Sequence, residues 1–187
     1  MLKINRRGLF AAGRTLIAAA LLGKLEGAAR AEDLLDFSHL QMLSPPTPAP
    51  DVSFLRADGS ALSLNAARGK GVVLNFWATW CPPCVAELPS LDRLTGMLAG
   101  SGIELWTVSE DLGERAAAKV RKFYDAHGIA HLPVLVDPHG QAADAFGNQG
   151  VPTTLLIDHA GLVRARFEGG TDWGEAAVAA KVRELVG

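Results

Sequence analysis

Cysteine is scarce in this sequence, because its 187 residues contain only two, Cys81 and Cys84. A structural zinc site takes four ligands, so this pair supplies only half of one. His127 and His131 have the spacing of a ligand pair, but more than forty residues separate them from the cysteines. We therefore expect no metal site. A disulfide that closes so short a loop contributes only about 2 kcal/mol by chain-entropy arithmetic, which is little for a structural cross-link.

A membrane-spanning run is missing as well. The apolar run at residues 16–22 is far shorter than the roughly twenty residues that cross a bilayer as a helix. Basic residues precede this run, and the small-x-small pattern Ala29-Arg30-Ala31 follows it. This order predicts a signal peptide over residues 1–31, and hence a periplasmic protein. No cysteine lies near the cleavage pattern, which excludes a lipoprotein.

The first residues of the signal peptide leave the export route open. Residues 5–10, NRRGLF, resemble a twin-arginine signal. They depart from it at Asn5, where Ser or Thr is usual, and in the order of Leu9 and Phe10. A basic start for the general secretory route explains the same residues.

Positive charge is also low in the rest of the chain. Beyond residue 31, 156 residues remain, with 12 Lys and Arg against 19 Asp and Glu, a formal charge of −7. This acidic balance argues against nucleic acid and anionic membranes as partners. Residues 44–50, SPPTPAP, suit neither a helix nor a central strand. We therefore assign residues 32–50 to a proline-rich linker and residues 51–187 to one domain.

Strand and helix patterns alternate along residues 51–187. Apolar runs predict strands at 72–77, 103–109 and 133–137, and helical patterns follow at 83–98, 114–127 and 141–146. Turn residues predict hairpins at 52–64 and 153–168, and a closing helix spans 173–186. The alternation indicates an α/β fold with a mostly parallel sheet covered on both faces, to which the last hairpin adds antiparallel strands.

The segment FWATWCPPCVAELP, residues 76–89, places Cys81 where a buried strand gives way to a helix. The free N–H groups and the dipole at a helix start stabilise a thiolate, which is the attacking species in disulfide exchange. Cys84, one turn further on, can resolve a mixed disulfide. Pro82 and Pro83 remove two N–H donors, which leaves those of Cys84 and Val85 and limits the lowering of the thiol pKa. The pattern predicts a redox pair.

The stretch NFWATWCPPCVAELP at residues 75–89, followed by GVPTTLLIDHAGLV at 150–163, resembles the thioredoxin superfamily. It is most similar to the exported TlpA/ResA-like thiol–disulfide oxidoreductases, from about residue 51 to the end. The resemblance implies a thioredoxin-like three-layer fold: a central mixed sheet with helices on both faces, an N-terminal β-hairpin and an inserted α/β element at 114–137. It also implies a monomer with no cofactor beyond the redox-active disulfide Cys81–Cys84.

The resemblance further implies a substrate surface. Pro152 matches the cis-proline that faces the redox pair, and Val151 before it would offer backbone hydrogen bonds to an extended substrate segment. Trp80 matches an aromatic shelf beside the nucleophile, although a packed aromatic explains it as well. Pro82 and Pro83 complete the expected substrate-binding residues.

Two polar positions bear on proton transfer. Glu87 matches an acidic residue near the active site of this branch, where it would move protons to or from Cys84. An ordinary solvated glutamate on a helix is the alternative. Asn75 stands where thioredoxins carry a buried aspartate, and because an amide does not titrate, any proton relay must use Glu87 or water.

These residues favour a periplasmic reductase of selected protein disulfides. The resemblance implies that its substrates are thiols of apocytochrome c or of copper-delivery proteins, and that a membrane donor supplies its electrons. A peroxiredoxin-like peroxidase is a second hypothesis, but it wants Thr or Ser three residues before its cysteine, where this chain has Ala78. A copper or zinc chaperone that uses the same cysteines is a third. An oxidant that introduces disulfides is a fourth, which the same residues allow. The two prolines between the cysteines favour a donor of electrons.

Overall fold

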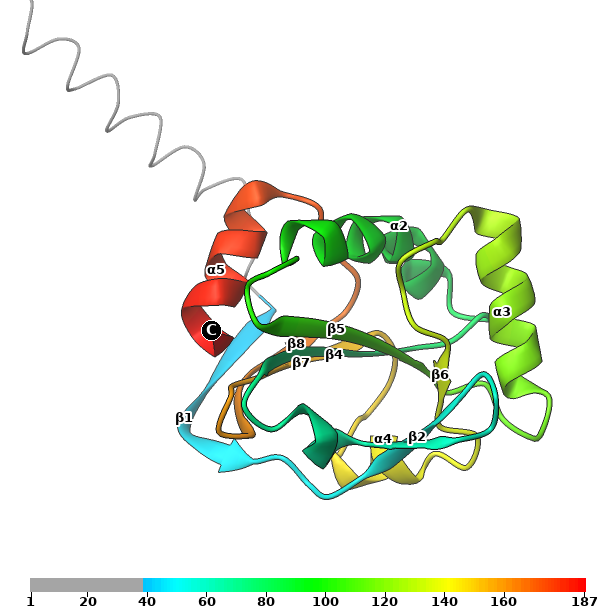
Figure 1. Cartoon of the computed structure of the whole chain (residues 1–187), viewed down its shortest axis with the longest axis horizontal. Coiled ribbons are helices and arrows are strands. Elements are labelled where there is room, and N and C mark those ends of the chain that lie inside the picture. Colours follow the sequence, from blue (N-terminus) through cyan, green and yellow to red (C-terminus); the bar gives the residue numbers. More distant parts are fainter. Residues whose placement is uncertain (1–38) are drawn as a thin grey trace, which may run out of the picture. The chain divides into compact units, whose positions relative to one another are not determined.

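The structure is a computed structural model that describes residues 39–187 (Figure 1). The predicted signal peptide, residues 1–31, lies outside the described residues, as do residues 32–38 of the predicted linker. Within residues 39–187, no helix has the length and apolar character needed to span a bilayer.

An eight-stranded sheet runs through the domain in the order β1-β8-β7-β4-β5-β6-β2-β3. The strands are β1 (Leu40–Pro48), β2 (Ser53–Arg56), β3 (Ala61–Ser63), β4 (Gly71–Trp77), β5 (Ile103–Ser109), β6 (Leu135–Val136), β7 (Thr153–Ile157) and β8 (Leu162–Glu168). Only two neighbouring pairs of strands, β4 with β5 and β5 with β6, are parallel. The mixed sheet is confirmed, but the expectation of a mostly parallel one is wrong, because hairpins and an edge strand flank the centre on both sides.

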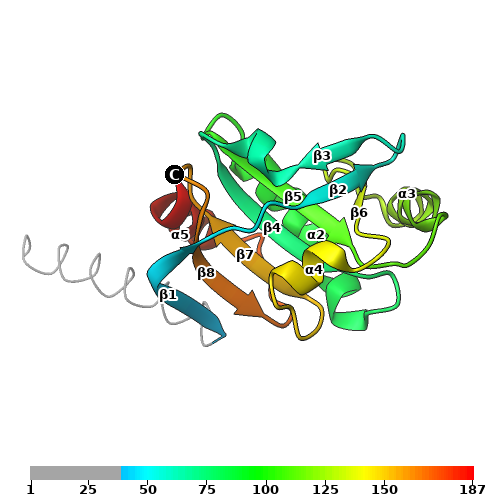
Figure 2. The same ribbon diagram turned by 90° about the horizontal axis from the view of Figure 1, so that it is seen from below.

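Helices cover both faces of this sheet. They are η1 (Leu64–Ala67), α2 (Pro82–Met97), α3 (Ala116–His127), α4 (Gln141–Ala145) and α5 (Ala176–Val186). Figures 1 and 2 show α2 and α5 on one face and α4 on the other. The arrangement matches the predicted three-layer fold.

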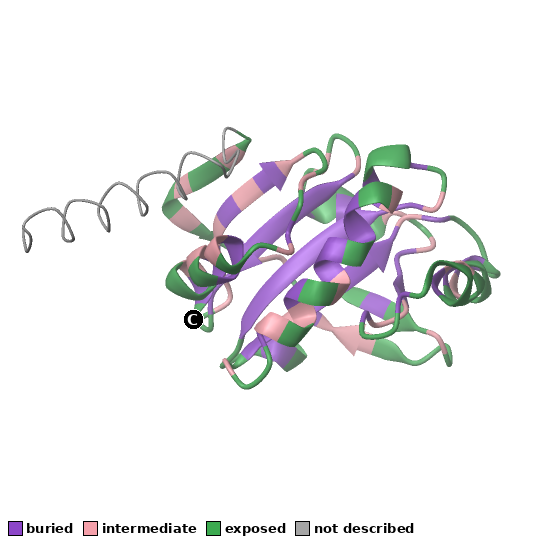
Figure 3. Cartoon of the chain, turned by 90° about the horizontal axis from the view of Figure 1, so that it is seen from above, coloured by how far each residue is buried: buried purple, intermediate pink, exposed green. Residues whose placement is uncertain are grey.

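Every residue of β4 is buried, so this strand forms the centre of the domain (Figure 3). Successive side chains of a strand point to opposite faces. Phe76 packs with Phe54 and Phe146 in the core on the side of α4. Trp77 points the other way and stacks on Tyr124 of α3, with ring centroids 5.5 Å apart. Aromatic packing on both faces of the sheet therefore holds β4 in place. The segment that contains Cys81 and Cys84 begins at the C-terminal end of this strand.

The proline-rich segment is an edge strand rather than a linker. Leu40–Pro48 forms β1, which pairs antiparallel with β8, and its register shifts between Met42 and Thr47. An edge strand needs hydrogen bonds on one side only, so prolines without N–H groups are tolerated there. The sheet of the domain therefore includes Leu40–Pro48, which precede the predicted start at residue 51.

The predicted N-terminal hairpin and inserted element are both present. β2 and β3 pair across Asp58-Gly59, where Arg56 N–H donates to Ser60 C=O at 2.8 Å and Gly59 has a φ of 82°. The inserted element is α3 followed by β6, which has only two residues instead of the predicted five. β6 joins the parallel centre to this hairpin, since it pairs with both β5 and β2.

Candidate active site

The two cysteines lie at the N-terminus of α2, directly after the buried strand β4. Cys81 is the N-cap residue of the helix, and its sulfur accepts a hydrogen bond from Cys84 N–H at 3.3 Å. The two sulfurs are joined in a disulfide with 5.3 Å between the Cα atoms. Cys84 is wholly buried, whereas 4% of Cys81 is exposed. Of the two cysteines, Cys81 is therefore the one that keeps exposed surface.

The helix start offers the Cys81 sulfur fewer donors than the sequence suggests. Pro82 and Pro83 occupy the first two helical positions and have no N–H. Val85 N–H, one of the two donors that these prolines leave, binds Cys81 C=O at 3.1 Å as an ordinary helical bond. Only Cys84 N–H faces the sulfur. Backbone stabilisation of a thiolate at Cys81 is therefore limited to one hydrogen bond and the helix dipole.

The segment before β7 forms the opposite wall of the site. The carbonyl oxygen of Val151 lies 3.6 Å from the Cys81 sulfur. The Val151–Pro152 peptide bond is cis, and Pro152 C=O accepts a hydrogen bond from Gly169 N–H at 2.9 Å. Val151 and Pro152, seventy residues from the cysteines, thus lie against them as the sequence motif predicts.

The remaining predicted substrate residues lie on the surface around Cys81. Trp80 is 64% exposed, so the alternative of a packed aromatic is wrong. Pro82 and Pro83 are exposed as well. The contact of these residues with a substrate stays a prediction.

Glu87 is buried on the face of α2 that meets the sheet, with only 3% of the residue exposed. The alternative of a solvated surface glutamate is therefore wrong. Asn75 Nδ2 donates to one carboxylate oxygen at 2.9 Å, and Trp173 Nε1 donates to the other at 3.1 Å. Thr171 N–H also donates to that second oxygen, at 3.3 Å. All three named partners are donors, so they suit the ionised carboxylate.

Burial and hydrogen bonding act on the Glu87 carboxyl in opposite directions. Burial removes the charged form from water and raises the pKa, whereas the hydrogen bonds from Asn75, Trp173 and Thr171 lower it. Burial dominates, and the pKa of Glu87 rises from its ordinary value of 4.5 to about 7. A carboxyl group with this pKa can accept and release a proton near neutral pH.

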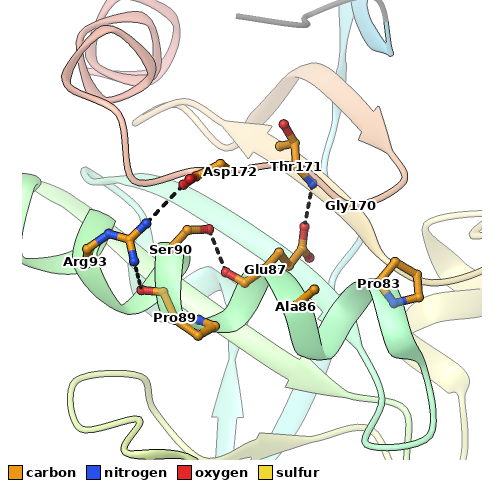
Figure 4. A pocket seen from close by; sticks show the side chains of 9 residues that line it. All are labelled: Pro83, Ala86, Glu87, Pro89, Ser90, Arg93, Gly170, Thr171 and Asp172. Atoms are coloured by element: carbon orange, nitrogen blue, oxygen red, sulfur yellow. Dashed lines mark hydrogen bonds and ion pairs between the residues drawn. The ribbon is translucent and has the colours of Figure 1, made fainter.

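A groove of about 330 Å³ beside α2 reaches the buried Glu87 (Figure 4). The residues that line it are Pro83, Ala86, Glu87, Pro89, Ser90, Arg93, Gly170, Thr171 and Asp172. Figure 4 shows the Glu87 carboxylate directed at Thr171 on the segment after β8, which Arg93 ties to α2 through Asp172 at 3.2 Å. More than eighty residues separate Glu87 from Thr171, and no motif in the sequence indicates that the two lie in contact.

In the part of the chain that the structure describes, the residues that a peroxidase or a metal site would require are not found beside the cysteines. Ala78 is fully buried and offers no hydroxyl to the cysteines. His131 binds Asp92 at 2.9 Å, whereas His127 contacts Phe123 C=O at 2.8 Å on α3. Across residues 39–187, no three His, Cys, Asp or Glu side chains are grouped as a metal site.

A thioredoxin-like sheet, a Cys-Pro-Pro-Cys pair at a helix start and a facing cis-proline define the class of thioredoxin-fold thiol–disulfide oxidoreductases. Residues 45–166 match the sequence model of the AhpC/TSA family. The chain belongs to this family.

Relatives and solved structures agree with that assignment. The thiol–disulfide oxidoreductase ResA of Halalkalibacterium halodurans is 36% identical over 124 residues, which are 65% of this chain and 68% of the relative. The thioredoxin-like protein YneN of Bacillus subtilis is 36% identical over 116 residues, 62% of this chain and 66% of the relative.

Two solved structures share the fold. The exposed lipoprotein thioredoxin of Streptococcus pneumoniae is 31% identical with a TM-score of 0.62, over 73% of this chain and 100% of that one. A thiol:disulfide interchange protein of the thioredoxin family from Chlorobium tepidum is 28% identical with a TM-score of 0.60, over 74% of this chain and 97% of that one.

Proposed function

We propose that this protein is exported to the periplasm and works there as a reductase of selected protein disulfides. The observation that carries the proposal is the unequal placement of the two sulfurs. Cys81 keeps 4% of its surface exposed and lies beside Val151, while Cys84, one helical turn on, is wholly buried. This asymmetry suits an attacking thiol and a resolving thiol.

The proposed reaction begins with both thiols reduced. The Cys81 thiolate attacks one sulfur of a substrate disulfide, which forms a mixed disulfide and releases the other substrate sulfur as a thiolate. Cys84 then loses its proton and attacks the Cys81 sulfur, which closes Cys81–Cys84 and frees the second substrate thiolate. Two electrons pass to the substrate, and its two thiolates take up protons.

Glu87 is proposed to handle the proton of Cys84. Its buried carboxylate lies on the same helix, three residues after Cys84, and its pKa of about 7 lets it hold a proton in either direction of the exchange. The groove beside α2 gives this carboxyl a route for protons to solvent. Asn75 donates to Glu87 and does not titrate, so it orients the carboxylate without competing for the proton.

The biological setting rests on the leader pattern and on the resemblance of the site. We propose thiols of cytochrome c maturation or of copper proteins as substrates, with a membrane donor that restores the dithiol. Relatives named thiol–disulfide oxidoreductase ResA support the reaction. Protein recovered from the periplasm should begin at Glu32, and a chain that still starts at Met1 would contradict the proposed cleavage.

Insulin reduction tests the reaction. The wild-type protein, kept reduced by dithiothreitol, should precipitate the insulin B chain, and Cys81→Ser should abolish this activity. A Cys81→Ser variant with the wild-type rate would refute the mechanism. Electron direction is tested separately by alkylation of the protein in acid-quenched cells. A reductase should be found mainly as the dithiol, whereas a fully oxidised population would indicate an oxidant instead.

A further inference from the structure

Asp111 is a buried carboxylate to which the proposed thiol exchange assigns no role. It follows β5 by two residues, and only 2% of it is exposed. One carboxylate oxygen accepts from Thr79 N–H at 3.0 Å and from Ser109 Oγ at 2.7 Å, and the other accepts from Thr79 Oγ1 at 2.8 Å. Lys119 Nζ on α3 lies 2.5 Å from that second oxygen. Both oxygens are therefore held by donors inside the domain.

These contacts keep the Asp111 carboxyl charged. Burial raises its pKa, but the hydrogen bonds from Lys119, Thr79 and Ser109 outweigh burial and hold the pKa below its ordinary value of 3.8. A charged acceptor forms stronger hydrogen bonds than a neutral one. Because Thr79 donates with both its N–H and its hydroxyl, Asp111 fixes the backbone of Thr79 as well as its side chain.

Thr79 belongs to the turn that leads into the redox pair. Cys81 N–H donates to Ala78 C=O at 3.2 Å, which closes a four-residue turn with Thr79 and Trp80 at its centre. This turn directly follows β4, and Cys81 at its end is the N-cap residue of α2. The hydrogen bonds from Thr79 therefore anchor the middle of the turn to Asp111, on the segment after β5.

The anchor matters more in one redox form than in the other. In the oxidised protein the disulfide itself ties Cys81 to Cys84, so the turn is held at both its middle and its end. In the dithiol this covalent tie is gone, and the position of Cys81 depends on noncovalent contacts alone. Loss of the anchor would therefore give conformational freedom mainly to the dithiol, which stabilises that form relative to the disulfide.

We propose that Asp111 is a positioning residue of the redox pair, which holds the Cys81 thiol beside Cys84 by anchoring the turn at Thr79. Two thiols that are kept together close their disulfide more readily, and closure is the step that delivers two electrons to the substrate disulfide. The inference rests on the proposed function, because it explains how this pair becomes a stronger electron donor.

The thiol–disulfide equilibrium of the purified protein with glutathione tests this role. Acid quenching and alkylation at a series of glutathione ratios give the equilibrium constant for closure of the disulfide. Asp111→Ala removes the acceptor of both Thr79 bonds, Thr79→Val removes the hydroxyl without a change of charge, and Thr79→Ser keeps it. Asp158→Ala is the matched control, because Asp158 is also buried and accepts from the N–H groups of Ala160 and Leu162, but lies at the turn between β7 and β8.

We expect Asp111→Ala to lower the equilibrium constant for closure about tenfold, which corresponds to about 30 mV for a two-electron couple. Thr79→Val should lower it about threefold in the same direction, and Thr79→Ser should keep the wild-type value. The double variant Thr79→Val with Asp111→Ala should match Asp111→Ala alone, because the hydroxyl then has no acceptor to lose. Asp158→Ala should leave the constant unchanged.

A merely structural role of Asp111 predicts a different result. It would destabilise the oxidised and the reduced protein equally in urea, and the equilibrium constant would stay within twofold of wild type, which refutes the positioning role. A constant that falls as far in Asp158→Ala also refutes it. An effect of Asp111→Ala without any effect of Thr79→Val would mean that the Asp111 charge acts on Cys81 directly, and the anchored turn would be wrong. If Asp111→Ala does not fold, Thr79→Val against Thr79→Ser decides alone.

The wild-type protein tests the proposed function in the same experiment. A pair that stays mostly as the dithiol where oxidised glutathione exceeds the reduced form is an oxidant, and the proposed reductase is then refuted whatever the variants show. A wild-type pair that closes readily, with a constant that Asp111→Ala and Thr79→Val leave unchanged, refutes the role of Asp111 and leaves the proposed function in place.

Discussion

Glu87 gives the domain a pH dependence of stability that one substitution should remove. Its carboxyl is buried, and its pKa of about 7 lies well above the ordinary value of 4.5. Glu87→Gln keeps the size and shape of the side chain but cannot ionise. The Gln carbonyl oxygen can still accept from Trp173 and Thr171. Asn75 Oδ1, which is buried without a partner in the present arrangement, becomes an acceptor for the Gln amide if the Asn75 side chain flips.

The sign and size of this pH dependence follow from the proton that Glu87 binds. Between pH 4.5 and about 7 the folded protein keeps a proton on Glu87 that the unfolded chain has released. The stability from this group is therefore complete below pH 4.5 and is lost as the pH rises to about 7. One pKa unit corresponds to about 1.4 kcal/mol, so the shift predicts a loss on the order of 3 kcal/mol across that window.

Urea unfolding of the oxidised protein at a series of pH values from 4.5 to 8 measures this loss of stability directly. We expect the stability difference between Glu87→Gln and wild type to shift in favour of the variant by about 3 kcal/mol over this range. Other carboxyl groups act in both proteins, so the difference isolates Glu87. A difference that stays constant with pH would show that Glu87 keeps an ordinary pKa, and the proton route proposed for Cys84 would lose its basis.

Three further predictions follow from individual positions. Asn75→Asp places a second carboxylate against Glu87, in the position from which Asn75 Nδ2 donates to it at 2.9 Å. The variant should lose on the order of 3 kcal/mol of folding stability at pH 8 but much less at pH 6. Equal losses at the two pH values in urea unfolding would contradict this. Gly71→Ala should lower stability by about 1–3 kcal/mol in a thermal scan, because the new Cβ would lie 2.5 Å from Val186 C=O. At Gly96 in α2 a new Cβ would meet no atom beyond the neighbouring helix backbone within 4 Å, so Gly96→Ala should be neutral or stabilising in the same scan. The reduced protein should consume hydrogen peroxide at the slow rate of an ordinary thiol, since Ala78 supplies no hydroxyl; fast second-order consumption in stopped flow would revive the peroxidase hypothesis.

The sequence predicts the parts of this fold that depend on local pattern. The apolar run of β4, the prolines after Cys81 and the turn at Asp58-Gly59 each determine their own conformation, and the structure contains all three. The prediction of a linker at the proline-rich segment is wrong because an edge strand has no local signature. Pro45 and Pro46 exclude a central strand, and only β8, more than a hundred residues later, supplies the partner.

The candidate site likewise has parts that the sequence predicts and parts that it does not. The motifs locate Cys81, Cys84 and Pro152, and the structure brings them together. The surroundings of Glu87 depend on Trp173 and Thr171, and those of Thr79 depend on Asp111. These are tertiary hydrogen bonds between distant segments, and neither composition nor periodicity carries information about them.

In the proposed mechanism Cys81 attacks the substrate and Cys84 resolves the mixed disulfide. Two single-cysteine variants, Cys84→Ala and Cys81→Ala, expressed in the native compartment and separated without reductant, test it most directly. Because Cys84 is fully buried, we expect mixed disulfides of protein substrates on Cys84→Ala, released by dithiothreitol, and almost none on Cys81→Ala. Equal trapping by both variants, or trapping only when Cys84 is the remaining thiol, would contradict it.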